Sequence, residues 1–161
     1  MSLKRALALI GTDPLYKDLC ERLSKMSGDI EIIFDKLEGS KLGEHSYIKN
    51  KDSEKISIIA IDVYKTRLNP REQIHAILHE TIHAATVNYL SDHKELSQKL
   101  KKYVDYIVDV NSDSLFYATM DTYGFENERE FIAEFFTNPM FRESLKYMEP
   151  MESKEFKSLF H

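Results

Sequence analysis

The feature of this 161-residue chain that most constrains its fold is a long helical pattern beginning at Asn69 and Pro70. Asparagine is a favoured N-cap and proline suits the first helical position, and Glu72 follows Asn69 at the spacing of a capping box. Apolar residues then recur at helical spacing, which predicts a buried stripe. The stripe comprises Ile74, Ile77, Leu78, Ile82 and Ala85. We expect this helix to end near Tyr89 or Leu90.

The same helix carries an H-E-x-x-H motif formed by His79, Glu80 and His83. Because residues four apart share a helical face, both imidazoles project to one side. Two neutral imidazoles plus a glutamate that is not a ligand are the pattern of a zinc site that activates water. Zinc lowers the pKa of such a water towards ~7, and Glu80 would take its proton as the water attacks a carbonyl. His75 lies a further turn away, ~6 Å along the axis, so we expect it not to join the same ion.

A third protein ligand must come from elsewhere, and the segment 127–141 is the best candidate. Glu130 and Glu134 are four residues apart, so they share one face of a predicted helix. The rest of this helix is apolar and aromatic, with Phe131, Ile132, Phe135 and Phe136. Carboxylates in such a packed segment are costly unless they are paired or bind a metal. The alternative is that Asn127 caps the helix, Glu130 is only its capping-box partner, and Glu134 is exposed.

The rest of the chain predicts an α+β fold, with a small N-terminal β-sheet packed on the motif helix and further C-terminal helices. The expected elements of the first half are a helix over 16–26, a strand over 30–34 and a hairpin whose strands are 45–50 and 55–64. After the motif helix, Asp92 and Glu95 are expected to cap a second one. Its apolar face comprises Leu96, Leu100, Tyr103 and Ile107. No repeat or linker interrupts the chain, so residues 1–161 are expected to form a single domain.

Composition excludes several classes of protein. The hydrophobic content of 42% and charged content of 30% are typical of a globular chain. The net charge of −5, with acids and bases mixed, argues against a nucleic-acid partner. The apolar run 6–10 is too short to span a membrane and lacks the cleavage site of a signal peptide. The single cysteine, Cys20, forms no internal disulfide, which favours a reducing compartment and a cytoplasmic location.

The motifs together resemble a known group. "HETIH", followed by a helix containing "ExxxE", resembles the gluzincin metallopeptidases, in which a glutamate ligand lies downstream of H-E-x-x-H. "EFIAEFFTNP", residues 130–139, is similar to the E-x-x-A-N-x-F-A helix of small intracellular regulator-cleaving metallopeptidases. It is closer to the "EFxAEAFxNPxFQ" segment of zincin-like domains encoded in phages and mobile elements. The chain departs from the first pattern at Glu134, which replaces Asn, and from the second at Phe135, which replaces Ala. The resemblance covers about residues 72–141.

The resemblance implies a zincin-like fold and a zinc-dependent metallopeptidase acting on a peptide or protein substrate. Glu130 would be the third zinc ligand, and Glu134 would accept a hydrogen bond from the far nitrogen of His79. In zincins an edge strand near the metal pairs with an extended peptide. The run Lys55–Asp62 would be that strand or lie next to it, although its apolar residues on both faces suit a central strand equally well.

Two questions stay open at this point. The domain could instead be a zincin-fold metal-binding or virion-associated interaction module without turnover; Glu80 favours catalysis, because a purely structural site has no use for a non-ligand carboxylate there. A second donor to the developing oxyanion is also needed. Tyr123, in the segment just before the Glu130 helix, is the first choice, and Tyr117 and His45 are alternatives. Neither the substrate nor the oligomeric state follows from the sequence.

Overall fold

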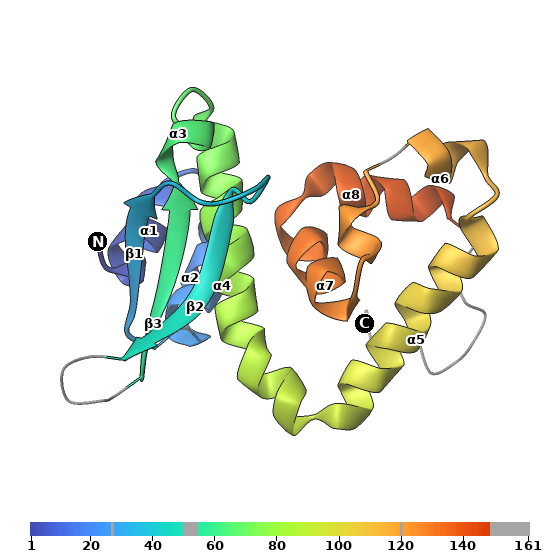
Figure 1. Ribbon diagram of the computed structural model, residues 1–161, viewed down its shortest axis with the longest axis horizontal. Helices are drawn as coiled ribbons and strands as arrows, with labels where there is room; N and C mark the ends of the chain where they lie inside the picture. The colour runs from blue at the N-terminus through green and yellow to red at the C-terminus, as the bar shows by residue number, and fades with distance from the viewer. Residues whose placement is uncertain (27, 50–54, 120, 149–161) are drawn as a thin grey trace. The chain divides into compact units, whose positions relative to one another are not determined.

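The computed structural model describes residues 1–26, 28–49, 55–119 and 121–148, which combine helices with a small sheet (Figure 1). The predicted α+β class is therefore confirmed. The chain divides into two compact units, of which the first is Met1–Val87 and the second begins at Asn88. The boundary lies inside a long helix, α4 (Pro70–Asp92). Whether the chain folds as a single domain stays a prediction.

The first unit contains a three-stranded sheet among its described residues, in the order β1-β3-β2. β1 (Ile30–Asp35) is parallel to β3 (Lys55–Asp62), and β2 (Gly43–Lys49) is antiparallel to it. The predicted hairpin pairing is confirmed, and its turn, residues 50–54, lies outside the described residues. β3 is the central strand, which explains why it is apolar on both faces: Ile59 and Ile61 are buried on one face, and Ile58 and Ala60 on the other. β3 is thus not an edge strand of the described sheet, and it lies next to the two edge strands, β1 and β2.

Two helices precede the sheet. α2 (Lys17–Met26) matches the prediction, whereas α1 (Leu3–Ile10) was not predicted. α1 buries Leu3, Ala6 and Leu7, which are spaced three and four residues apart on one face. Just before α1, the main chain of Met1 accepts a hydrogen bond from the N–H of Ile32 at 2.8 Å, and Ser2 bridges to Glu31. These contacts cover the outer side of β1, as proteins commonly do with edge strands.

A buried acid joins the end of β3 to the loop that leads into β2. Asp62 caps α3 (Val63–Thr66) by accepting the backbone N–H groups of Tyr64 and Lys65 at 2.9 and 2.8 Å. Its other oxygen accepts the N–H of Leu37 and the ammonium of Lys65, each at 2.9 Å. Lys65 also donates to the carbonyls of Leu37 and Lys41, at 3.0 Å each. Burial alone would raise the pKa of Asp62, but the hydrogen bonds from Lys65 and Leu37 outweigh it and hold that pKa well below its ordinary value.

We expect Asp62→Asn to lower the melting temperature of the metal-free protein by on the order of 5 °C or more at neutral pH, because Lys65 loses its charged partner. The folded-state pKa of Asp62 lies below the unfolded value of ~3.9, so its stabilisation is complete above about pH 4 and is lost as the pH falls further. The gap between wild type and variant should therefore narrow in acid. Calorimetry across this range in chelator checks it, and a gap that does not change with pH would contradict this reading.

Helix α4 begins as predicted. The side chain of Asn69 accepts the backbone N–H groups of Arg71 and Glu72 at 3.2 and 3.3 Å, and Pro70 is the first helical residue. The capping box is not formed, because the N–H of Asn69 is donated to the carbonyl of Thr66 at 3.0 Å. The helix is buried along Ile77, Leu78 and Ile82. It lies beside the sheet (Figure 1).

The end of α4 differs from the prediction. The helix continues to Asp92, so this residue does not cap the next helix, α5 (Lys94–Asn111). The N-cap of α5 is His93, which makes no side-chain capping bond. The predicted apolar face of α5 is confirmed at Leu100 and Ile107, both buried.

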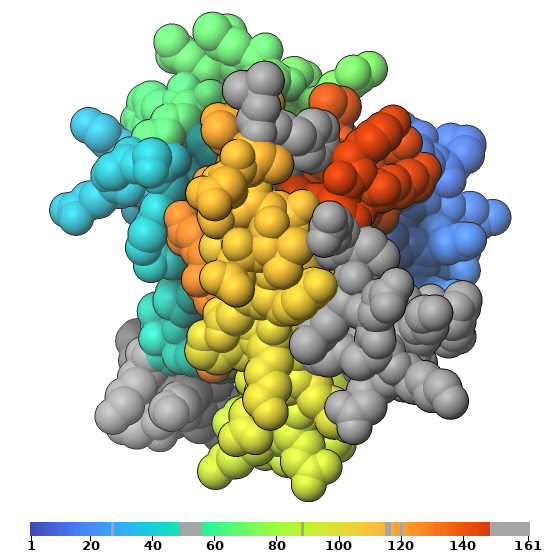
Figure 2. Space-filling view, turned by 90° about the vertical axis from the view of Figure 1, so that its right-hand side faces the viewer, coloured from blue at the N-terminus to red at the C-terminus, as the bar shows by residue number. Residues whose placement is uncertain are grey.

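The second unit consists of helices packed around an aromatic core. After α5 the elements are α6 (Leu115–Thr119), η1 (Tyr123–Phe125), α7 (Glu128–Thr137), α8 (Pro139–Ser144) and η2 (Leu145–Tyr147). The buried cluster comprises Val104, Ile107, Phe125, Phe131, Phe141 and Met148. Figure 2 looks onto α5, drawn in yellow. Phe136, predicted to be packed, is instead 52% exposed because it lies on the side of α7 away from this cluster.

Within the described residues, no helix combines the length and the apolar character that crossing a membrane requires.

Candidate metal centre

Helix α4 brings His79 and His83 together. Their Nε2 atoms lie 3.0 Å apart and their ring centroids 4.7 Å apart. His79 is buried, and His83 is half-buried. Two Zn–N bonds of ~2.0–2.1 Å in tetrahedral geometry separate the two nitrogens by roughly 3.3 Å. Opening the pair by a few tenths of an ångström would therefore admit the ion, and the two imidazoles are compatible with a metal site.

His75 lies on the same side of α4 but is less well placed. Its ring centroid is 5.7 Å from that of His79, compared with 4.7 Å between His79 and His83. One nitrogen of His75 still comes within 4.8 Å of a nitrogen of His79. The geometry thus favours the pair predicted from the motif, His79 and His83, and His75 lies further from His79 than His83 does.

The carboxylate of Glu80 lies against strand β2. Its Oε2 atom accepts the backbone N–H of His45 at 2.9 Å. A Cβ atom added to Gly43 would sit only 2.7 Å from Cγ of Glu80 and 3.3 Å from its Oε1. Gly43 and the main chain of His45 were not predicted to be part of the site. No sequence pattern indicates them, because Glu80 is thirty-five residues from His45.

The ring of His45 contacts two other side chains of the sheet. Its Nε2 lies 2.7 Å from Oγ of Ser57, and the ring meets that of Tyr47 edge-on, with centroids 5.1 Å apart. Burial lowers the pKa of His45, and the nearby His83 lowers it further. Both effects favour the neutral form of this imidazole.

Two acids of the second unit have different environments on α7. Asn127 caps this helix by accepting the N–H groups of Arg129 and Glu130 at 2.9 and 3.1 Å, as expected. Glu130 is half-buried in the first turn. Glu134 is only 5% exposed, and its Oε2 accepts the side-chain amide of Asn138 at 2.7 Å. The alternative in which Glu134 is exposed is therefore wrong.

The tyrosine expected to act as a donor lies on η1, close to α7. Tyr123 is 43% exposed, and its N–H donates to Asp121 at 3.0 Å. The next residue must be glycine because of a close approach: a Cβ at Gly124 would meet Phe141 at 2.6 Å and Glu134 at 3.1 Å. The role of Tyr123 stays a prediction. Burial raises the pKa of the alternative donor, Tyr117.

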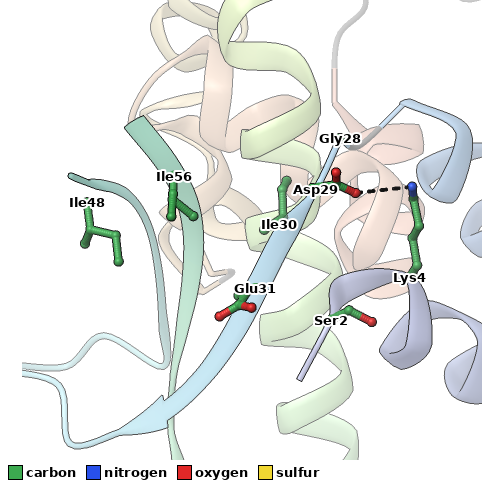
Figure 3. Close-up of a pocket in the computed structure, with 8 residues that line it drawn as sticks. All are labelled: Ser2, Lys4, Gly28, Asp29, Ile30, Glu31, Ile48 and Ile56. Atoms are coloured by element: carbon green, nitrogen blue, oxygen red, sulfur yellow. Dashed lines mark ion pairs between the residues drawn. The ribbon is translucent and has the colours of Figure 1, made fainter. Parts of the chain in front are cut away.

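A pocket of about 580 Å³ lies elsewhere in the first unit (Figure 3). It is bordered by the ion pair of Lys4 and Asp29, at 3.5 Å, and by the side chains of Ile30, Ile48 and Ile56. None of the predicted site residues lines this pocket. It is therefore distinct from the histidine pair on α4.

No family model, curated protein or solved structure matches the chain. The interpretation of the site depends on its own residues and their geometry.

Proposed function

We propose that this chain is a zinc-dependent metallopeptidase. The observation that carries the proposal is the convergence of the His79 and His83 Nε2 atoms, 3.0 Å apart, on the helix that also holds Glu80 against strand β2. This set combines two imidazole nitrogens that could bind one ion with a carboxylate that accepts a backbone hydrogen bond from β2. Such an arrangement suits a metal that keeps a position open for water.

The third ligand is proposed to be Glu130, with Glu134 holding the far nitrogen of His79. The environments of the two acids support this division of roles. Glu134 is buried and already fixed by Asn138, whereas Glu130 is half-buried in the first turn of α7. A carboxylate locked by a side-chain amide is suited to orienting a ligand, and a more accessible one is suited to binding the ion itself.

Zinc, when bound, acts as a Lewis acid that activates water and polarises a carbonyl group. Glu80 then acts as the general base: it takes a proton from the attacking water and passes it to the nitrogen of the leaving amine. The products are a carboxylic acid and an amine, and the carboxylate of Glu80 is regenerated. Tyr123 is the proposed second donor to the oxyanion.

The substrate is proposed to be an extended peptide that pairs with the outer side of β2. Bonded and non-bonded pairs alternate along an antiparallel ladder. The N–H of His45 donates to Glu80 and not to β3, so His45 belongs to a non-bonded pair of the ladder. Tyr47 lies two residues further along β2 and has the same orientation. The main-chain groups of both residues therefore point away from β3. The carbonyl of His45 and both main-chain groups of Tyr47 are thus positioned to bind a substrate backbone. Because Cys20 is buried with its thiol unpaired, a reducing, cytoplasmic setting suits the chain.

Metal analysis tests the first half of the proposal. Purified protein reconstituted with zinc should hold about one ion per chain, and chelation should remove it. A zinc content near zero ions per chain would contradict the proposal.

Glu80→Gln tests the proposed role of Glu80 as the general base. The amide keeps the size and the hydrogen bond to His45 but cannot take a proton, so the variant should retain zinc and lose at least ~10²-fold of peptide hydrolysis. The measurement is turnover of a peptide library, compared with wild type at equal zinc content. Turnover that survives in the variant would exclude Glu80 as the base. Zinc binding without hydrolysis by the wild type would instead favour a non-catalytic binding module.

A further inference from the structure

We propose that Gly43 and the main chain of His45 form a cradle that positions Glu80 for proton transfer. This inference rests on the proposed function and adds to it two positioning residues on the strand opposite the motif helix. Neither acts through its side chain, since one has none and the other contributes its backbone N–H. The cradle is therefore the part of β2 in which Gly43 and His45 contact Glu80.

The first contact is steric. Cγ of Glu80 would lie 2.7 Å from a Cβ at position 43, a separation that side chains do not tolerate. Only glycine at position 43 allows the side chain of Glu80 to lie flat against β2 at this point. Gly43 therefore fixes how close the base approaches the edge of the sheet.

The second contact is polar. The 2.9 Å bond from the His45 N–H to Oε2 of Glu80 has a charged acceptor, which makes it stronger than a bond between neutral groups. A glutamate has several rotatable bonds, and this contact restricts them before any substrate arrives. An edge-strand N–H that would otherwise face solvent is also satisfied. The geometry of proton transfer is thus set in advance.

Hydrogen bonds from Lys65 fix the segment that leads into the cradle. Lys65 binds the carbonyls of Leu37 and Lys41 at 3.0 Å each, and its ammonium is in turn paired with the buried Asp62. Lys41 is two residues before Gly43, so these bonds fix where β2 begins. The position of the base is therefore tied to the rigid end of β3 and not to the loop alone.

The arrangement has a functional consequence. The proposed substrate pairs with the outer side of β2 beginning at His45, and Glu80 is held by the same short segment. One stretch of backbone would then align both the base and the scissile peptide. Small movements of β2 would shift both together and preserve their separation, on which the rate depends steeply.

The first test is Gly43→Ala, with Gly28→Ala as the matched control because a Cβ at Gly28 meets nothing within 4 Å. Gly43→Ala should displace the carboxylate and lower kcat by on the order of 10²-fold, while KM changes by less than ~3-fold and zinc content stays the same. The loss should vanish in a Glu80→Gln background, because the two changes act through one group. Equal kcat in the two alanine variants, or an undiminished loss in the Gln background, would overturn the cradle.

The second test isolates the N–H. His45→Pro deletes a group that points away from β3, so no ladder bond is lost, and His45→Ala removes the ring but keeps the N–H. The proline variant should have a kcat at least ~10-fold below that of the alanine variant. Equal rates in the two would overturn the role of the N–H.

Amide hydrogen exchange provides a readout that does not require activity or a stable proline variant. The His45 amide should be protected in the zinc-loaded protein and should exchange at least ~10-fold faster in Glu80→Ala, while the Tyr47 amide is unchanged. A chain that binds no zinc overturns the proposed function and the cradle with it. A zinc-loaded, active chain whose His45 amide exchanges equally fast with and without Glu80 overturns the cradle alone.

Discussion

His79→Ala and His83→Ala should each abolish zinc binding. The two Nε2 atoms converge at 3.0 Å on one side of α4, so either substitution leaves a single imidazole where the ion needs a pair. A site reduced from three protein ligands to two loses most of its affinity. The expected result is less than about a tenth of an ion per chain after dialysis against submicromolar zinc, measured by elemental analysis.

His75→Ala is the matched control, because it removes an imidazole from the same side of the same helix. The ring of His75 is 5.7 Å from that of His79, so its loss should leave zinc bound. Circular dichroism should show that all three variants keep their helix content. If His75→Ala empties the site and His83→Ala does not, the ion is held by the other pair of histidines on α4.

The elements predicted correctly are those specified by local chemistry. Asn69 and Pro70 define the start of α4 because capping depends on residues within one turn of each other. The convergence of His79 and His83 likewise follows from helical geometry alone. The antiparallel pairing of β2 with β3 followed from two short strand patterns separated by a turn. In each case the interacting residues are close in sequence.

The errors arise where a tertiary contact or a weak local signal decides the outcome. α1 spans only eight residues, so its apolar spacing is too short a pattern to stand out. The capping box failed because the N–H of Asn69 found another acceptor, the carbonyl of Thr66. α4 continues to Asp92 without a glycine or proline to end it, which removed the expected cap of α5.

The candidate site shows the same division. The proposed ligands and the proposed base can be recognised in the sequence as a motif, but the surface of β2 that Glu80 contacts cannot. Gly43 lies in a turn-rich stretch, where glycine is ordinary, and nothing nearby indicates that Glu80 lies against it. Contacts between segments distant in sequence depend on the packing of α4 on the sheet, which periodicity does not specify.

The two acids of α7, Glu130 and Glu134, should differ in how strongly their loss affects zinc binding. A zinc ligand must bring an oxygen to ~2.0–2.2 Å from the ion, and residues four apart in a helix are separated by ~6 Å along the axis. In the proposed site, Glu130 binds the ion directly and Glu134 reaches only a ligand, the far nitrogen of His79. Glu130→Ala should remove a direct bond and empty the site at submicromolar zinc.

Glu134→Ala should instead weaken zinc binding by only ~10–100-fold, the usual cost of losing a group that orients a ligand. It should also lower stability, because Glu134 is buried and holds the side chain of Asn138, the residue that caps α8. Competition with a chelator of known affinity gives both dissociation constants, and melting curves without metal separate the structural loss. If Glu134→Ala abolishes binding while Glu130→Ala does not, the roles are reversed, and Glu130 is left as a first-turn acid that interacts favourably with the dipole of α7.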